Sequence, residues 1–493
     1  MGHDASRSRP GRPRRVAIIG AGPGGICTGV RLLQAGHEDF VILEKAPGVG
    51  GTWWHNRYPG AECDVKSHLY SFSFAPNPAW SRPYARQPEI RAYLEECVQT
   101  FGLEPYLRLG TEVRAARWDE DRAVWRLTVE PGDEIEAEVV VSALGMFGAP
   151  VAPDILGLDT FRGTVFHSAR WDDAHDLTGE SVAVIGSAAS AVQFVPEIAP
   201  VVGHLDLYQR SANWVLPKED TPFTEEQLDA LRRDPDAVTA LRDTTFEIIN
   251  ATITFSDPNL LAGAEAAGLH NLEAVDDPEV RRQLTPTMPF GCKRPLSSNV
   301  YYPTFNRPNV DLVVDPIAEV TANAIITADG RVRPVDTIIL ATGFATTKFL
   351  GALDVVGRGG RHIDTAWADG AQAYLGIATT GFPNLFMLYG PNTNNGSIIY
   401  MIECQVDYVM RQLQRLEDED LAWVDVRQEV MDEYNDALQH DLAGVDVWQA
   451  GCNGYYRVPS GRIVTQWPHT MSEYRARTER ADSDAYEVAW TSD

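Results

Sequence analysis

"RRVAIIGAGPGG", residues 14–25, predicts a buried strand that runs into a tight turn and then into a helix. Gly20, Gly22 and Gly25 give the turn the spacing G-x-G-x-x-G, in which glycine lets the backbone approach a pyrophosphate resting on the helix N-terminus. Glu44 ends the next predicted strand, 24 residues after Gly20, where its carboxylate would accept hydrogen bonds from ribose hydroxyls. The stretch therefore predicts a dinucleotide-binding unit that suits FAD.

A second stretch repeats this layout 166 residues later. "VAVIG" at 182–186 echoes "VAIIG" at 16–20, and a helical pattern again follows the turn. Alanine replaces the second and third glycines of the fingerprint, which loosens the approach to phosphate but permits the helix to pack. The predicted cofactor contacts of this unit are Gly186, Ser187, Ser190 and Arg210.

The two units differ in charge at the end of their second predicted strand. Arg210 lies 24 residues after Gly186, at the count that gives Glu44 in the first unit. A carboxylate would repel a 2′-phosphate, whereas a guanidinium can bind it through two hydrogen bonds. The second unit therefore suits NADPH, and the two sites together indicate an oxidoreductase that passes electrons from NADPH to FAD.

Six cysteines are scattered along the chain without a C-x-x-C pair. Disulfide reductases of the same architecture need neighbouring cysteines beside the flavin, so this class is disfavoured. The pattern predicts reduced, mostly buried thiols in a cytoplasmic protein, with neither a disulfide framework nor a metal site.

Charge and length limit the kinds of partner and the number of domains. A formal net charge of -27 predicts that the chain repels nucleic acids and anionic membrane surfaces. The chain has no apolar run of the length that spans a membrane. Its 493 residues are expected to form two or three domains. The sequence makes no prediction about the oligomeric state.

The order of these patterns predicts an α/β protein with two Rossmann-like dinucleotide-binding domains, one for FAD and one for NADP, and a helical insertion in the second. Acidic helical patterns mark the insertion, and Thr224 and Gln227 form a capping box at its start. Alternating segments at about 107–117, 124–130 and 134–142 predict a small antiparallel meander. The predicted boundaries are 1–13 for a disordered tail, 14–150 and 378–493 for the FAD-binding domain, 151–217 and 291–377 for the NADP-binding domain, and 218–290 for the insertion.

"FRGTVFHSARWDD", residues 161–173, precedes the second turn and carries the spacing F-x-G-x-x-x-H-x-x-x-W-[P/D]. It resembles the fingerprint of type I Baeyer–Villiger monooxygenases, and within that family the chain is most similar to the branch containing 4-hydroxyacetophenone monooxygenase. The resemblance also covers "GGTWWHNRYPGAECD" (50–64), "GCKRPLSSNVYYPTFNRPNV" (291–310) and "LYGPNTNNG" (388–396). The fingerprint residues are Phe161, Gly163, His167, Trp171 and Asp172.

The resemblance implies an FAD- and NADPH-dependent enzyme that uses O2 to convert a ketone to an ester or lactone through a C4a-peroxyflavin. Arg294 would keep the peroxide deprotonated and stabilise the oxyanion, and Asp64 would orient Arg294. Lys293 would contact the NADP 2′-phosphate beside Arg210. His167 would lie in the linker between the two domains and couple their rotation to cofactor use. The residues implied to lie near the flavin are Thr52, Trp53, Tyr58, Asp64, Asn392 and Thr393.

Two alternative functions remain open from the sequence. A related flavin enzyme would oxidise sulfur or nitrogen through a protonated hydroperoxide, although Trp171 and the Asp64/Arg294 pair favour the ketone reaction. A flavin-bound protein that senses NADPH without turnover would show no substrate-stimulated O2 uptake. The intact fingerprints at both dinucleotide sites favour an enzyme over a sensor.

Overall fold

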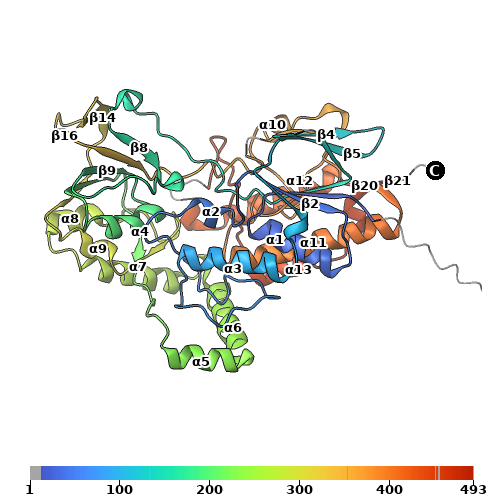
Figure 1. The fold of residues 1–493 in the computed structure, drawn as a ribbon, viewed down its shortest axis with the longest axis horizontal. Coiled ribbons are helices and arrows are strands. Elements are labelled where there is room, and N and C mark those ends of the chain that lie inside the picture. Colours follow the sequence, from blue (N-terminus) through green and yellow to red (C-terminus); the bar gives the residue numbers. More distant parts are fainter. Residues whose placement is uncertain (1–12, 133, 352, 450, 453–455, 492–493) are drawn as a thin grey trace, which may run out of the picture.

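The computed structural model describes residues 13–491 apart from 133, 352, 450 and 453–455. The predicted disordered tail, residues 1–13, therefore lies outside the described residues except for its last position. Figure 1 shows two lobes side by side, with helices α5 and α6 projecting below them. The predicted α/β class with two dinucleotide-binding units is confirmed.

The first lobe is built on a parallel sheet with the strand order β19-β7-β1-β2-β3. Every residue of β1 and β7 is buried, as expected where helices and loops cover both faces of a parallel sheet. This sheet contains the predicted strand before the first glycine-rich turn and the strand that ends at Glu44. Its strands are β1 (Val16–Ile19), β2 (Phe40–Glu44), β3 (Leu107–Leu109), β7 (Val139–Ser142) and β19 (Leu385–Met387).

Helices cover this sheet, and the longest of them, α11, packs against α1, α13 and β20. The first helix ends where the sequence predicts, because Gly36 adopts a φ of +76° immediately after the cap residue. Among the described helices, none has both the length and the apolar character needed to cross a membrane. The remaining elements of the lobe are α1 (Pro23–Gln34), α2 (Thr52–His55), α3 (Gln87–Thr100), α10 (Ile363–Ala366), α11 (Ile398–Asp418), α12 (Gln428–Ala443), α13 (Met471–Thr478), and the antiparallel pair β20 (Leu421–Val426) and β21 (Tyr486–Trp490).

The second lobe repeats the parallel arrangement, with the strand order β13-β10-β9-β17-β8. The predicted strand and helix around the second glycine-rich turn are its β9 and α4. The elements of the lobe are β8 (Thr164–His167), β9 (Ser181–Ile185), β10 (His204–Tyr208), β13 (Val310–Val313), β17 (Thr337–Leu340), α4 (Ala189–Ile198), α9 (Tyr301–Thr304), and the antiparallel strands β14 (Ile317–Val320), β15 (Ala324–Thr327) and β16 (Val332–Pro334).

The predicted meander forms, but its membership differs from the prediction. Residues 107–109 and 139–142 belong to the parallel sheet, so only the middle of the predicted region is antiparallel. A fourth strand joins it from residues 354–356, which pair with 115–117. Its strands are β4 (Glu112–Asp119), β5 (Val124–Glu130), β6 (Glu134–Ala137) and β18 (Asp354–Val356).

This pairing bears on one predicted domain boundary, which stays a prediction. Leu350, Leu353 and Val355 belong to one buried cluster with Ile19 and Val140 of the first sheet. The chain has therefore returned to the first lobe before residue 377, where the sequence analysis placed the end of the NADP-binding segment. This return could not be predicted, because a three-residue strand has no recognisable periodicity.

The insertion is helical, as predicted, and local capping explains its helix starts. The capping box between Thr224 and Gln227 is present at the first helix. Asp234, Asp257 and Asp277 each precede a proline and cap the next three helices through their side chains. The short strands β11 (Val215–Leu216) and β12 (Leu296–Ser297) pair where the chain enters and leaves the insertion. Its helices are α5 (Glu225–Arg233), α6 (Pro235–Thr252), α7 (Pro258–Leu272) and α8 (Pro278–Leu284).

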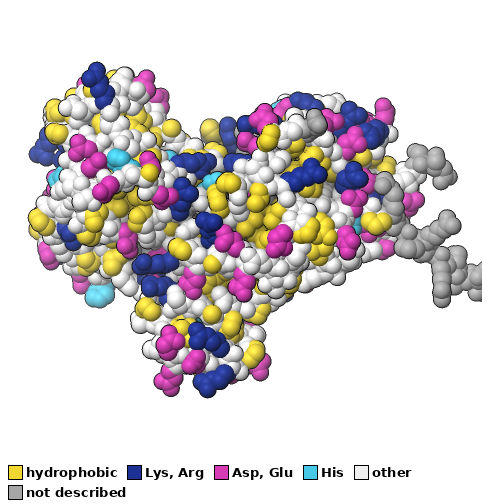
Figure 2. Space-filling model, viewed as in Figure 1, with side chains coloured by type: hydrophobic (Ala, Val, Ile, Leu, Met, Phe, Trp, Pro, Cys, Tyr) yellow, Lys and Arg dark blue, Asp and Glu magenta, His cyan; other side chains and the backbone are white. Residues whose placement is uncertain are grey.

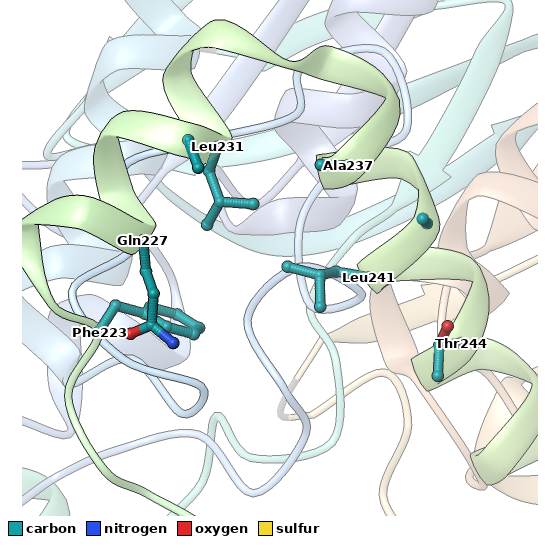
Figure 3. Close-up of a pocket in the computed structure, with 8 residues that line it drawn as sticks. Phe223, Gln227, Leu231, Ala237, Leu241 and Thr244 are labelled. Atoms are coloured by element: carbon teal, nitrogen blue, oxygen red, sulfur yellow. The ribbon is translucent and has the colours of Figure 1, made fainter.

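A groove of about 430 Å³ lies between α5 and α6. Figure 3 shows Leu231 of α5 and Leu241 of α6 lining it from opposite sides, with Phe223 near one end. None of the residues that line this groove is a predicted site residue, so the groove belongs to the insertion and not to the dinucleotide sites.

The cysteines differ from the prediction. Cys292 and Cys452 form a disulfide whose Cα atoms lie 5.5 Å apart, whereas the sequence analysis predicted reduced thiols throughout. The partners are 160 residues apart in the chain, so spacing could not reveal the pair. The other four cysteines are free and buried, as predicted: Cys27, Cys63, Cys97 and Cys404.

Candidate active site

The first glycine-rich turn has the geometry of a dinucleotide cradle. Gly20 adopts a φ of +107°, and a Cβ on Gly25 would lie 1.9 Å from the Gly20 carbonyl oxygen. Side chains are therefore excluded where the strand must turn closely into α1. The N-terminus of α1 opens at this turn with Gly22 as its cap and no acidic residue in its first turn. The backbone N–H groups and the positive helix end fit a pyrophosphate.

Glu44 is held rigidly beside this turn. One carboxylate oxygen accepts a hydrogen bond from the Ala21 N–H at 2.8 Å, and the other accepts from the Ala46 N–H at 2.7 Å. Each carboxylate oxygen has further acceptor capacity, so this fixed group can also accept a ribose hydroxyl. The position of Glu44 thus fits the predicted FAD site.

The second turn has the same geometry, with alanine in place of two of the glycines. Gly186 adopts a φ of +110°, and a Cβ there would lie 2.4 Å from the Ala341 carbonyl oxygen. Ala188 takes the N-cap position of α4 in extended conformation. The Ser187 carbonyl accepts a hydrogen bond from the side chain of Asn213.

The count that identified Arg210 is one residue too long. Ile19 pairs with Leu43, whereas the corresponding Ile185 pairs with Tyr208, an offset shorter by one. Gln209 therefore stands where the first unit has its glutamate, and Arg210 follows it. Helix α4 has 10 residues whereas α1 has 12, so the second unit is shorter between its first two strands, which counting from Gly186 could not show.

Arg210 nevertheless contributes to a cationic group. Burial and the positive charge of Arg210 lower the pKa of Lys293. Lys293 Nζ donates to the Ser211 hydroxyl at 2.5 Å. Two cations and a hydroxyl at the end of β10 fit the 2′-phosphate of NADP. On the face shown in Figure 2, several Lys and Arg side chains lie near the notch between the lobes, despite the acidic composition of the chain.

Asp64 and Arg294 form the predicted ion pair. The Nε and Nη2 atoms of Arg294 lie 2.7 and 2.6 Å from Oδ2 of Asp64. The two residues are 230 positions apart. Arg294 lies two residues before β12, where the chain leaves the insertion. About a third of each side chain is exposed, 32% for Arg294 and 35% for Asp64. The pair is therefore fixed but remains open to a bound molecule.

The sequence analysis missed a second cation that binds this segment. Lys218 Nζ lies 2.6 Å from Oε1 of Glu62, and the lysine side chain is only 4% exposed. The ammonium group also lies 4.3 Å from the centre of the Tyr84 ring. Lys218 follows β11 and Arg294 precedes β12. The residues at both ends of the insertion therefore bind the stretch that ends at Asp64. The scarcity of lysine in the chain was a signal that could have identified this residue.

Gln193 of α4 is a second missed residue. Its side-chain amide donates to the Glu62 carbonyl at 3.0 Å and accepts from the Tyr58 hydroxyl at 2.9 Å. An α4 side chain thereby joins the NADP-binding unit to the stretch predicted to line the flavin. A polar residue within the apolar pattern "AVQFVPEI" was the available signal.

The residues implied to lie near the flavin occupy two segments. Thr52 begins the short helix α2, and the Trp53 indole donates to the Tyr70 hydroxyl. Asn392 and Thr393 are almost fully buried in the loop after β19. The Asn392 amide donates to two backbone carbonyls, and its Oδ1 has no partner among the described residues. A buried acceptor without a donor fits an N–H group of a bound cofactor.

Three titratable side chains of the first segment have pKa values shifted away from neutral pH. Burial, with a smaller contribution from Asp64, raises the pKa of Tyr58 to about 12. Burial also raises the pKa of Tyr70, with Asp64 again contributing. Burial together with nearby cations lowers the pKa of His55 to about 4. These side chains are uncharged at pH 7, so they offer the site no competing charge.

The fingerprint forms the edge of the second sheet and the connection to the first lobe. His167 ends β8, and its Nε2 lies 3.1 Å from the Gly343 carbonyl oxygen. Its Nδ1 accepts the Ala169 N–H, an arrangement that suits the neutral ring, and burial lowers the pKa of His167. A Cβ on Gly163 would lie 2.1 Å from the Asp336 carbonyl oxygen, so this position requires glycine.

The other fingerprint residues have structural roles. Trp171 is buried against Phe194 of α4, with ring centres 5.4 Å apart. Phe161 packs at the edge of a buried cluster of the second lobe. Asp172 accepts the Ala174 N–H and shapes the following turn. These fingerprint side chains thus make packing and turn contacts, and the linker role implied for the fingerprint stays a prediction.

Comparisons with known proteins agree with this geometry. A family model described as pyridine nucleotide-disulphide oxidoreductase matches residues 17–257. A Baeyer–Villiger monooxygenase of Pseudomonas aeruginosa is 43% identical over 484 residues, covering 97% of this chain and 92% of the relative. One of Streptomyces coelicolor is also 43% identical, covering 96% of this chain and 92% of the relative.

Solved structures show the same similarity. A cyclohexanone monooxygenase from Rhodococcus sp. Phi1 bound to NADP+ superposes with a TM-score of 0.86 at 31% identity, covering 97% of this chain and all of the other. OTEMO in complex with FAD and NADP gives a TM-score of 0.86 at 29% identity, covering 98% of this chain and all of the other.

Two dinucleotide cradles with opposite charge preferences, joined by an ion pair between the lobes, define an FAD- and NADPH-dependent flavoprotein monooxygenase. The chain belongs to the Baeyer–Villiger monooxygenase family. The resemblance inferred from the fingerprint is confirmed, whereas the finer assignment to the 4-hydroxyacetophenone branch stays a prediction.

Proposed function

We propose that this protein converts a ketone and O2 to an ester or lactone and water, with oxidation of one NADPH. The observation that carries the proposal is the Asp64–Arg294 ion pair, which stands between the two cofactor units. Bound FAD, once reduced by NADPH, supplies the activation of oxygen, and the chain supplies position and charge. The cofactor assignments rest on the cradles at Gly20 and Gly186 and on the cations Arg210 and Lys293.

Arg294 is suited to stabilise negative charge on oxygen. Its guanidinium is protonated at any pH at which the protein is folded, so it lowers the energy of an anionic nucleophile and of the oxyanion formed at the ketone carbon. Two of its nitrogens approach one oxygen of Asp64, which fixes the plane of the group. Asp64 is therefore a positioning residue for Arg294.

The exposure of the pair supports a catalytic role over a stabilising one. Ion pairs with this degree of exposure contribute about 0–1 kcal/mol to folding. Lys218, Glu62 and Gln193 nevertheless hold the segment before Asp64 with a largely buried ion pair and part-buried hydrogen bonds. Contacts that fix the position of a weakly stabilising ion pair are expected when the pair takes part in binding or catalysis.

The neutral surroundings favour the ketone over a heteroatom substrate. Oxidation of sulfur or nitrogen requires an electrophilic, protonated oxygen, whereas attack on a carbonyl requires a deprotonated one. Tyr58, Tyr70 and His55 do not release protons readily or carry positive charge at pH 7. The fixed positive charge of Arg294 therefore governs the protonation of oxygen in this site.

The finer structural and cellular assignments are also proposals. We propose that FAD is bound by 14–150 and by the segment from about 350 to the C-terminus, and NADPH by 151–217 and 291 to about 345, with 218–290 as a helical cover. We further propose that the protein acts in the cytoplasm. Fractionation of cells that express a tagged chain tests this location.

The test of function combines isotope labelling with a substrate panel. The purified FAD-loaded protein is supplied with NADPH, 18O2 and a series of cyclic and aryl ketones, and products are analysed by mass spectrometry. We expect an ester or lactone that contains one 18O atom for each NADPH consumed. A parallel panel of sulfides and amines separates the alternative, because sulfoxides formed without any ester would reject the proposal. Absence of substrate-stimulated O2 uptake with every compound would instead favour the NADPH-sensing protein.

A further inference from the structure

The Cys292–Cys452 disulfide joins two segments that meet beside the candidate active site. Cys292 lies two residues before Arg294, on the stretch that leaves the insertion. Cys452 belongs to the C-terminal part of the chain, four residues after the short helix Asp446–Trp448. The bond therefore fastens the stretch that carries Lys293 and Arg294 to the first lobe.

Non-covalent contacts align the same two segments. The Trp448 indole N–H donates to the Gly291 carbonyl at 3.1 Å. The Phe255 ring lies 6.0 Å from Trp448 and 6.3 Å from Phe290, centre to centre. A Cβ on Gly291 would lie 2.5 Å from the Phe255 ring, so the stretch passes closely under these aromatic side chains. Packing alone therefore brings the two sulfurs together, and the covalent bond then locks the arrangement.

The residues that follow Cys292 make the contacts proposed for NADPH binding and for catalysis. Lys293 binds Ser211 at the predicted 2′-phosphate site, and Arg294 binds Asp64. The two residues directly follow Cys292, and two peptide units span at most about 7 Å. A shift of the Cys292 backbone on breaking the bridge would therefore also move Lys293 and Arg294.

The pair differs from the other cysteines of the chain. Burial raises the pKa of Cys27, Cys63, Cys97 and Cys404, so these thiols are unreactive. Cys452 retains 8% exposure at the end of the bridge away from Arg294, whereas Cys292 is fully enclosed. Cys452 is thus the less enclosed of the two bridge residues.

We propose that the Cys292–Cys452 bridge is a reversible redox tether that positions Lys293 and Arg294. A dithiol reductant attacks the disulfide, breaks the S–S bond and leaves with a disulfide of its own, so that Cys292 and Cys452 gain two electrons and two protons as thiols. Hydrogen peroxide reverses the step by accepting two electrons and two protons to give two water molecules. In cytoplasmic proteins disulfides are rare and usually transient or redox-sensing, which agrees with the proposed location. The effect on ester formation rests on the proposed function, whereas the effect on NADP+ binding does not.

The experiment titrates the FAD-loaded protein through graded ratios of reduced and oxidised dithiothreitol. Thiols are counted after denaturation, NADP+ affinity is read from the perturbation of flavin absorbance, and coupling is read as ester formed per NADPH. We expect four thiols in the oxidised protein and all six in the reduced protein. On reduction, the dissociation constant of NADP+ should rise about fivefold or more, the low end of coupling between linked sites, and the coupling ratio should fall. Both should change at the midpoint given by the thiol count.

Two variants complete the test. In the Cys292→Ala/Cys452→Ala double variant, NADP+ affinity should match the reduced protein at every dithiothreitol ratio. Cys97→Ala removes a free thiol far from the bridge in sequence and should keep the full redox response. If the double variant does not fold, the titration of the unmodified protein decides alone. Six thiols under oxidising conditions, or a change from four to six thiols without any change in NADP+ affinity, would overturn the tether. Loss of NADP+ affinity on reduction with no ester in either state would support the tether and reject the proposed ketone reaction.

Discussion

Replacing Arg294 with alanine removes the only side chain assigned to stabilise negative charge at the reacting centre. The guanidinium is held by two contacts of 2.6 and 2.7 Å to one oxygen of Asp64, so its charge is preorganised. Loss of a preorganised oxyanion donor lowers kcat by about 10²–10³. Folding should be almost unaffected, because a pair about one-third exposed contributes roughly 0–1 kcal/mol and shifts Tm by only about 2–4 °C.

The assay separates the two half-reactions of the Arg294→Ala variant. Flavin reduction by NADPH is followed anaerobically in a stopped-flow instrument, and ester formation is followed under air with a ketone accepted by the unmodified protein. We expect reduction of the flavin to proceed and ester formation to fall by the stated factor, with NADPH oxidation yielding hydrogen peroxide instead. Arg294→Lys is the matched control, since it keeps the charge but loses the planar fork, and it should retain more product than alanine. Ester formation by Arg294→Ala at the unmodified rate would refute the role assigned to this charge.

Three further predictions address the cofactor, the support of the site and the pH dependence. Arg210→Ala should raise the KM for NADPH about tenfold and leave that for NADH nearly unchanged, and equal effects on both would remove Arg210 from the 2′-phosphate site. Lys218→Met should destabilise the protein by up to about 3–5 kcal/mol because it leaves Glu62, which is only 15% exposed, without its partner, and adding Glu62→Gln should recover most of the loss in Tm. Burial lowers the pKa of His68 to about 4 from 6.5, so the unfolded chain binds the proton more tightly and stability is lost as pH falls below 6.5. His68→Gln should therefore lose about 2 kcal/mol less than the unmodified protein between pH 7 and pH 5 in urea titrations, and identical losses would contradict this assignment.

Local signals in the sequence predicted the parts of the fold that local chemistry determines. The strand, glycine turn and helix at Gly20 and Gly186 were predicted because only glycine satisfies the positive φ and the close approach there. The capping box was predicted because Thr224 and Gln227 have the spacing at which each side chain reaches the other's backbone N–H. By contrast, residues 107–109 and 139–142 join the parallel sheet instead of the meander, since neighbouring strands are chosen by tertiary packing.

The candidate site shows the same division. Asp64 and Arg294 lie 230 residues apart, and only the family resemblance brought them together before the structure did. Lys218 and Gln193 escaped notice because their partner, Glu62, is distant in sequence and their role depends on burial. The shift from Arg210 to Gln209 at the end of β10 goes with a shorter helix, 10 residues in α4 against 12 in α1, which no composition signal marks. The bridge between Cys292 and Cys452 depends on a contact across 160 residues.

The paired strands β11 and β12 place the two ends of the insertion side by side. Because its two ends lie next to each other, the insertion can gain, lose or exchange helices without moving the two sheets of the lobes. Lys218 and Arg294 lie within two residues of the paired strands, outside the helices α5 to α8. Evolution can therefore remodel these helices while Lys218 and Arg294, beside the paired strands, keep their places.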